Sequence, residues 1–240
     1  MLRVAELWRY PVKSLLGETC DALEFDERGV KGDRLYAIRD SEGKFGSGKS
    51  TRRFRRIDGL FGLSASYDDD VPVIRFADGG TVRGDDHNIH TALSGVLAQP
   101  VTLAYEEAIP HFDAGPVHIV TTSALAWLQE RLPDHGIDSR RFRPNIVIDD
   151  TDKPVPAGGW AGKALAIGAA RLCITDPTER CVMVTTAQSE LEKAPGVLRM
   201  ITQERSMLFG LYAEVAVPGT INRGDLAALC DDWRGFSNIL

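Results

Sequence analysis

The sequence lacks the features that mark several common classes of protein. Its four cysteines include no Cys-x-x-Cys pair, so neither a zinc ribbon nor a thioredoxin-type motif is expected. Its five histidines follow no metal-ligand spacing. No apolar run approaches the roughly 18 residues that a membrane-spanning helix needs, and the first residues do not have the basic and apolar segments of a signal peptide. We therefore expect no membrane association and a cytoplasmic location.

An excess of positive charge is also missing. The 240 residues carry a net charge of −6, whereas broad nucleic-acid binding needs an excess of lysine and arginine. The composition, 43% hydrophobic and 26% charged, is typical of a folded protein that buries a core without disulfides. Nucleic acid is therefore not an expected partner. By default, each cysteine is a free thiol that packs as a small apolar side chain.

Short strand signals dominate the first hundred residues. Turn residues such as Asp78-Gly79-Gly80 separate them. Many short strands at close spacing predict a small barrel or a curled sheet. The predicted strands cover residues 3–9, 23–25, 35–38, 60–67, 73–76 and 81–82.

The second half of the sequence mixes strands with short helices. Apolar residues at helical spacing predict a helix over Ala124–Leu132, with Thr122 or Ser123 as its cap. The whole pattern predicts a β-rich α+β fold with a few short helices. The segment Pro110–Gly115 is the best candidate boundary between two domains, residues 1–110 and 111–240. Further strands are predicted at 117–121, 145–148, 165–167, 171–175, 182–185 and 208–217, and helices at 189–193 and 197–202.

Residues 43–50 match the phosphate-loop pattern G-x-x-x-x-G-K-[ST] of nucleotide hydrolases. That loop requires a helix that opens at Lys49, because the amide groups of its first turn hold the phosphates. Only two apolar residues lie between Lys49 and Gly59, which cannot supply the apolar stripe of a packed helix. The alternation of strand and helix in a parallel α/β sheet is missing too. Nucleotide hydrolysis is therefore a disfavoured alternative.

The same region is strongly cationic. Residues 43–57 carry six lysines and arginines and no acidic residue. One interpretation is a solvated edge hairpin whose charges discourage aggregation. The other is an anion-binding funnel in which one or two arginines reach a ligand phosphate.

Six polar motifs follow one another along the chain, five next to predicted strands and one, at residues 50–53, beyond a hairpin. They are Pro11-Val12-Lys13-Ser14, Gly32-Asp33-Arg34, Ser50-Thr51-Arg52-Arg53, Thr121-Thr122-Ser123, Phe142-Arg143-Pro144-Asn145 and Glu179-Arg180-Cys181. From Tyr10 to about Asp225 the chain resembles the MOSC (molybdenum cofactor sulfurase C-terminal) superfamily. It is most similar to the branch with an N-terminal β-barrel domain, which includes the mitochondrial amidoxime-reducing component and bacterial relatives.

The resemblance implies an architecture and a cofactor. It implies a β-barrel-like N-terminal domain over 1–110 and a MOSC β-barrel domain over 111–240. It also implies a molybdenum–pterin cofactor, with Cys181 as the catalytic residue and metal ligand, for which a soft thiolate is suited. Arg53 could replace Arg52 in the cofactor-binding set, and family-level descriptions add pyridoxal phosphate binding. The implied cofactor-binding residues are Lys13, Ser14, Arg34, Arg52, Ser123, Arg143, Asn145 and Arg180.

The activity that the resemblance implies is the reduction of small N-hydroxylated molecules. Electrons would come from a separate electron-transfer protein of the iron–sulfur, flavin or haem type. A sulfur carrier or sulfurtransferase, or a carrier of the molybdenum cofactor, would use Cys181 differently and stays an alternative. Relatives have an Asp-Pro-Asp-type turn after the cysteine segment, where this chain has Ala187-Gln188-Ser189-Glu190. The substrate class is therefore open.

Overall fold

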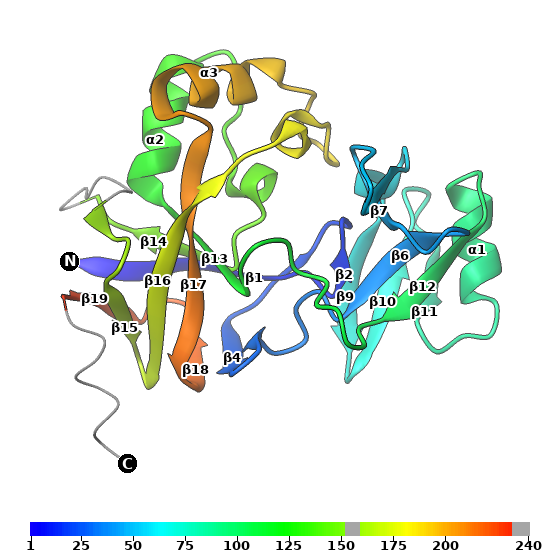
Figure 1. Ribbon diagram of the computed structural model, residues 1–240, viewed down its shortest axis with the longest axis horizontal. Helices are drawn as coiled ribbons and strands as arrows, with labels where there is room; N and C mark the ends of the chain where they lie inside the picture. The colour runs from blue at the N-terminus through cyan, green and yellow to red at the C-terminus, as the bar shows by residue number, and fades with distance from the viewer. Residues whose placement is uncertain (152–158, 232–240) are drawn as a thin grey trace.

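A closed barrel of seven strands forms the larger lobe of the computed structural model, which describes residues 1–151 and 159–231 (Figure 1). Around the barrel the strand order is β14-β13-β17-β16-β15-β19-β1, and pairing between β1 and β14 closes the ring. The strands are β1 (Leu2–Arg9), β13 (Val117–Thr121), β14 (Ile146–Asp149), β15 (Ala164–Ile167), β16 (Ala170–Glu179), β17 (Leu208–Val217) and β19 (Leu226–Cys230).

Alternating apolar residues of these strands fill the barrel. Val4 and Leu7 of β1 pack with Ile148 of β14 and Leu172 of β16, and Trp160 is enclosed with them. Each fully buried side chain of this size contributes about 1.5–3 kcal/mol through removal from water. The sequence pattern that predicted β1 therefore also supplies the interior of the barrel.

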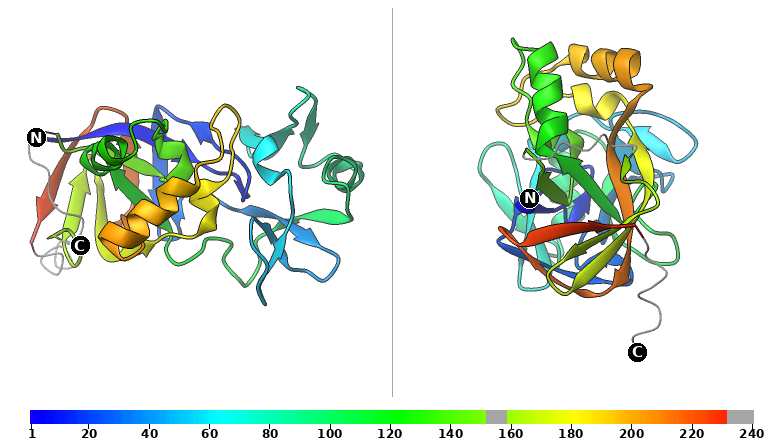
Figure 2. Two further views of the ribbon diagram at one scale, coloured as in Figure 1. Left: turned by 90° about the horizontal axis from the view of Figure 1, so that it is seen from above. Right: turned by 90° about the vertical axis from the view of Figure 1, so that its left-hand side faces the viewer.

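Two helices and two short 3-10 helices cover one side of the barrel. Figures 1 and 2 show α2 (Thr122–Arg131) and α3 (Pro195–Arg205) next to one another there. The 3-10 helices η2 (Ser139–Phe142) and η4 (Val182–Thr185) complete this cover. Their apolar residues form a separate core with β17. None of the helices in the described part of the chain has the length and apolar character to span a bilayer.

The smaller lobe contains two sheets that enclose a core of their own. That core includes Val12, Ile38, Leu63 and Leu93. Elsewhere, β3 (Glu18–Thr19) pairs with β1, and β4 (Ala22–Asp26) lies between β5 (Gly29–Val30) and β18 (Gly219–Asn222). The elements of the smaller lobe are β2 (Val12–Lys13), β6 (Tyr36–Asp40), β7 (Phe45–Ser47), β8 (Phe54–Arg56), η1 (Leu60–Gly62), β9 (Ser64–Asp68), β10 (Val71–Arg75), β11 (Thr81–Arg83), α1 (Ile89–Val96) and β12 (Val101–Tyr105).

The chain passes between the lobes more than once. Strand β1 belongs to the barrel, β2 then joins the smaller lobe, and β4 and β5 return to the barrel. A Cβ atom at Gly29 would lie 2.9 Å from Pro116, so the points where the chain leaves and re-enters the larger lobe touch. We keep residues 1–110 and 111–240 as a proposed domain division, with β1 contributed across it.

The β-rich α+β class is confirmed, but several local predictions were wrong. The cap of α2 is Thr121, not Thr122 or Ser123. Residues 182–185 form η4, not a strand, because the pairing of β16 with β17 ends at Glu179 and Leu208 and leaves no partner beyond it. Residues 189–193 form no helix, since Gln188 and Leu191 exchange backbone hydrogen bonds across a tight turn. The predicted strand at 60–67 begins instead with η1.

Residues 43–57 do not form a phosphate loop. Strands β7 and β8 run parallel within this segment, and residues 48–53 turn between them, so no helix opens at Lys49. The helix N-terminus on which nucleotide hydrolases depend is therefore missing from this place.

Candidate functional site

A cavity lies between the lobes, where the ends of β2 and β16 approach the turn before β6 and the segment 106–116. Its volume is about 110 Å³. Five cationic side chains and two carboxylates line it, so its walls favour an anionic ligand. The cations are Lys13, Arg34, Lys49, Arg143 and Arg180, and the carboxylates are Asp113 and Glu179.

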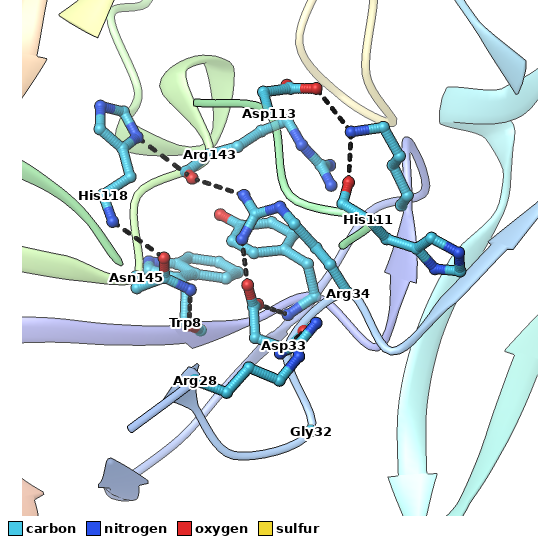
Figure 3. Close-up of polar contacts among 12 residues, drawn as sticks. Trp8, Arg28, Gly32, Asp33, Arg34, His111, Asp113, His118, Arg143 and Asn145 are labelled. Atoms are coloured by element: carbon cyan, nitrogen blue, oxygen red, sulfur yellow. Dashed lines mark hydrogen bonds and ion pairs between the residues drawn. The ribbon is translucent and has the colours of Figure 1, made fainter. Parts of the chain in front are cut away.

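Lys13 enters the cavity from β2 and is almost completely buried, with 5% of its side chain exposed. Its Nζ atom donates to the carbonyl oxygen of His111 (2.6 Å) and to Asp113 Oδ1 (2.5 Å), as Figure 3 shows. Burial lowers the pKa of Lys13, and the charge of Asp113 opposes that effect. Because the Asp113 side chain is itself 65% exposed, an anion with more acceptors could replace it.

Arg34 and Arg143 approach one another over the ring of Tyr10. The Arg143 guanidinium carbon lies 4.2 Å from the ring centroid and that of Arg34 lies 4.9 Å from it. Arg34 is paired with Asp33 and donates from Nη2 to the carbonyl oxygen of Arg143 (3.3 Å) (Figure 3). Burial and the charge of Arg34 lower the pKa of Arg143 to about 10. Two buried guanidinium groups over one ring, with a third cation, Lys13, in the same cavity, favour an anionic ligand there.

Cys181 lies between the end of β16 and the start of η4. Its side chain is half-buried and lines the cavity. Cys181 was predicted at the start of a strand over residues 182–185, but that segment is η4. Arg180, next to it, donates from Nη2 to the carbonyl oxygen of Phe142 (2.9 Å) and from Nη1 to His118 Nε2 (3.3 Å). His118 Nδ1 lies 3.3 Å from the carbonyl oxygen of Arg143. These contacts require a neutral imidazole with its proton on Nδ1, and His118 thereby fixes the direction of Arg180.

Three of the residues that line the cavity have left-handed backbone conformations. The φ angles are 66° at Ser14, 52° at Arg34 and 55° at Arg143. Such angles cost free energy in residues with a Cβ atom, and strained residues gather at functional sites. The backbone of three separate segments is therefore shaped toward the same cavity.

Six of the nine predicted site residues line this cavity, and three do not. The six are Lys13, Ser14, Arg34, Arg143, Arg180 and Cys181.

The remaining three have other surroundings. Ser123 donates from Oγ to Asp150 Oδ2 (2.5 Å) at the start of α2, and Asn145 ties the backbone amide of His118 to the carbonyl oxygen of Trp8. Arg52 is exposed, whereas Arg53 donates to the carbonyl oxygen of Pro110 (3.0 Å) beside the cavity.

Several residues of the cavity were not predicted. Asp113 lies in the segment that was treated only as a boundary, and His118 was set aside because the histidines have no metal spacing. A sequence signal for His118 exists, since a histidine inside the apolar run Val117–Thr121 must be buried with a partner. Tyr212 of β17 and Met183 of η4 also line the cavity, and only the folded chain brings them there.

Two buried nitrogen atoms of the cavity, Arg143 Nη2 and Arg180 Nε, have no hydrogen-bond partner within residues 1–151 and 159–231. A buried donor without an acceptor costs about 1–3 kcal/mol, which an anion would recover. In the same described part of the chain, no cluster of three or more His, Cys, Asp or Glu side chains could hold a metal ion. A metal bound at Cys181 would therefore need ligands from a cofactor.

Comparison with known proteins gives relatives that cover most of the chain. Mitochondrial amidoxime-reducing component 1 of Homo sapiens is 27% identical over 277 residues, which cover 92% of this chain and 81% of that protein. Mitochondrial amidoxime reducing component 2 of Bos taurus is 23% identical over 284 residues, with the same two coverages. Molybdenum cofactor sulfurase of Drosophila ananassae is 32% identical over 117 residues, covering 48% of this chain and 14% of that protein. The YuaD protein of Bacillus subtilis has a similar fold, with a TM-score of 0.54, 13% identity and coverage of 95% and 96% of the two chains.

Two family models match the chain in sequence order. The MOSC N-terminal beta barrel domain matches residues 1–85. The MOSC domain matches residues 95–227, more than half of the chain. The chain therefore belongs to the MOSC family.

Proposed function

We propose that this protein is a molybdenum-cofactor-dependent oxidoreductase that reduces N-hydroxylated compounds, with Cys181 as the protein ligand to molybdenum. The observation that carries the proposal is the position of this half-buried thiol in a cavity that also contains two buried arginine donors without partners. A thiolate suits a soft metal, and paired arginines suit a phosphate. Relatives named amidoxime-reducing components agree with this activity.

The cavity residues fit the phosphate end of the cofactor. Arg34 and Arg143 would hold the phosphate from two sides, and Ser14 and Lys13 would donate from the β2 turn. Because the cavity measures about 110 Å³, it accepts a phosphate, and a pterin would require the segment with Asp113 to move. Before that movement, the exposed Asp113 carboxylate is paired with Lys13.

The cofactor, when bound, would supply the redox chemistry, and the protein would supply binding and orientation. In the overall reaction the N–O bond is cleaved with two electrons and two protons, which gives the N–H compound and water. We propose a separate electron-transfer protein of the iron–sulfur, flavin or haem type as the electron source. The word "component" in the names of the two relatives agrees with a system of several proteins.

Replacement of the thiol tests the proposal. Purified wild-type protein is expected to contain molybdenum and to reduce an aryl N-hydroxyamidine with an artificial electron donor. Cys181→Ser should lower kcat at least 100-fold, while Cys230→Ser, at a half-buried thiol outside the cavity, should keep wild-type rates. Elemental analysis and steady-state kinetics on the same preparations measure both effects.

The match to a molybdenum cofactor sulfurase favours a second candidate, in which Cys181 carries sulfur. It predicts a persulfide on Cys181, trapped by alkylation and seen by mass spectrometry, in protein without molybdenum. Wild-type reductase activity in Cys181→Ser would overturn the metal-ligand role of this thiol, and absence of the persulfide would overturn the second candidate.

A further inference from the structure

A second cleft adjoins the Cys181 cavity on the side of the smaller lobe. One wall comes from residues 56–64 and 75–77, and the other from Met183, Thr186, Ala187 and Ser189 after the cysteine. Its volume is about 660 Å³, which is within the usual range for small-molecule sites. The cleft is therefore large enough for the body of a substrate whose reacting end lies at Cys181.

Met183 separates the cleft from the cavity, and its side chain lines both. The backbone N–H of Gly48 donates to Met183 Sδ at 3.0 Å, and the Ser47 hydroxyl lies 3.8 Å from the same sulfur. The Met183 thioether thus connects η4 to the end of β7 across the passage, meaning the opening between the cavity and the cleft. Because methionine is unbranched and adapts its shape, it can move aside without disturbing the backbone.

The walls of the cleft combine apolar and polar side chains, and its rim is cationic. Phe61 and Phe76 offer aromatic surface, and Phe61 also lies 5.7 Å from the guanidinium group of Arg143. At the rim, Arg56 is paired with Asp58 (2.9 Å), so Arg75 at the end of β10 gives the cleft its net positive charge. A flat apolar group with an anionic substituent matches these walls.

Resting on the proposed reductase function, we propose that this cleft is the substrate-binding groove and that it selects N-hydroxylated aryl compounds with a carboxylate. The N–O group lies beside Cys181, the aryl body occupies the cleft, and the carboxylate reaches Arg75. Met183 limits the width of the passage between the two spaces. Arg75 therefore selects for charge at the far end of the substrate, and Met183 selects against bulk near its N–O group.

The charge selection is tested with three aryl N-hydroxyamidines that are neutral, carry a para-carboxylate or carry a para-trimethylammonium group. In Arg75→Gln, the ratio of kcat/KM for the carboxylate to that for the neutral substrate should fall about tenfold, as expected for loss of one charge-assisted contact. Arg199→Gln, at an exposed position of α3 outside the cleft, should keep the wild-type ratio. An unchanged ratio in Arg75→Gln overturns the assignment.

The width selection is tested with biphenyl and phenyl substrates. Met183→Ala should raise the biphenyl-to-phenyl ratio of kcat/KM about fivefold, whereas Met183→Leu, which keeps the bulk, should not. Equal ratios in the alanine and leucine variants overturn the role of Met183.

Failure of the proposed function gives a different result. If no variant and no substrate shows reduction, calorimetry with an unreactive arylcarboxylate tests the cleft alone. Binding that is lost in Arg75→Gln and kept in Arg199→Gln supports the cleft even then. Absence of binding to the wild-type protein overturns it.

Discussion

His111 and His118 are both buried beside arginine side chains. His118 Nε2 accepts a hydrogen bond from Arg180 Nη1, and His111 Nε2 lies 3.2 Å from Arg39 Nη2. Burial lowers the pKa of His111 to about 4, and it lowers the pKa of His118 well below its ordinary value. The folded protein thus keeps both imidazoles neutral at pH values at which an unfolded chain binds protons on them.

This difference makes the stability of the protein depend on pH. Below about pH 6.5 the unfolded chain binds protons at these positions and the folded chain does not, so the free energy of unfolding falls as the pH falls. Each histidine contributes a slope that approaches about 1.4 kcal/mol per pH unit between pH 6 and 5. Urea unfolding of wild type, His111→Gln and His118→Gln at half-unit intervals should show a smaller slope in each variant.

The exposed residue His87 provides the control for this prediction. His87→Gln should retain the wild-type slope, because 88% of this side chain is exposed and its replacement changes no buried group. A wild-type slope in His118→Gln would contradict the assignment of His118 as a neutral, buried group.

At the scale of single residues, the sequence identified candidate site residues where a motif offers few alternative positions. Lys13 ends β2, Cys181 lies two residues beyond β16, Arg143 lies three residues before β14, and each lines the cavity. Ser123 could not be separated from a cap by sequence, because its partner Asp150 is 27 positions away. The choice between Arg52 and Arg53 depends on the exact turn between β7 and β8, which composition does not determine.

Among the elements, β17 packs closely against His118 beside the site. Gly210 has a φ of 93°, and a Cβ atom there would overlap His118 Nε2 and lie 2.9 Å from the carbonyl oxygen of Ile119. Gly210→Ala should therefore lower the free energy of unfolding by about 2–4 kcal/mol, from backbone strain and overlap together. Chemical denaturation measures the loss. If the proposed function holds, displaced His118 should also release Arg180 and lower the molybdenum content of the purified protein.

Gly95 in α1 is the matched control for Gly210. A Cβ atom at Gly95 meets nothing within 4 Å, so Gly95→Ala should raise the free energy of unfolding by up to about 1 kcal/mol. If both alanine variants had the same stability, the contact between β17 and His118 would not constrain position 210.

Elements were predicted best where both the pattern and the pairing partner were present. Residues 117–121 and 208–217 alternate or are continuously apolar, and they pair with one another as β13 and β17. Residues 182–185 have strong strand propensity, yet no neighbouring strand extends that far. Helix α1 was missed although Ile89 and Leu93 are four residues apart and buried, because the helix has only eight residues.

For the molecule as a whole, β1 connects the two ends of the sequence. It pairs with β14 on one side and with β19 on the other. A fragment of residues 111–240 therefore has two strand edges without a partner, and we expect it to lack cooperative unfolding and amide protection. Addition of a peptide of residues 1–30 should restore both, as measured by hydrogen exchange.

A peptide in which Leu7 is replaced by Asp serves as the control for this complementation. Leu7 is enclosed in the barrel, so the altered peptide should fail to restore protection. Cooperative unfolding of the fragment without any peptide would contradict the role of β1 and would support residue 110 as the boundary of an autonomous domain.

The pairing of Leu2 with Ala227 also constrains how a cell makes this protein. Strand β1 leaves the ribosome before its β19 partner, which follows about 10–45 s later at translation rates of roughly 5–20 residues per second. Throughout that interval an apolar strand stays without a neighbour on one side. The yield of soluble protein should therefore depend on translation speed and on chaperones that protect nascent chains, even where the mature fold is stable.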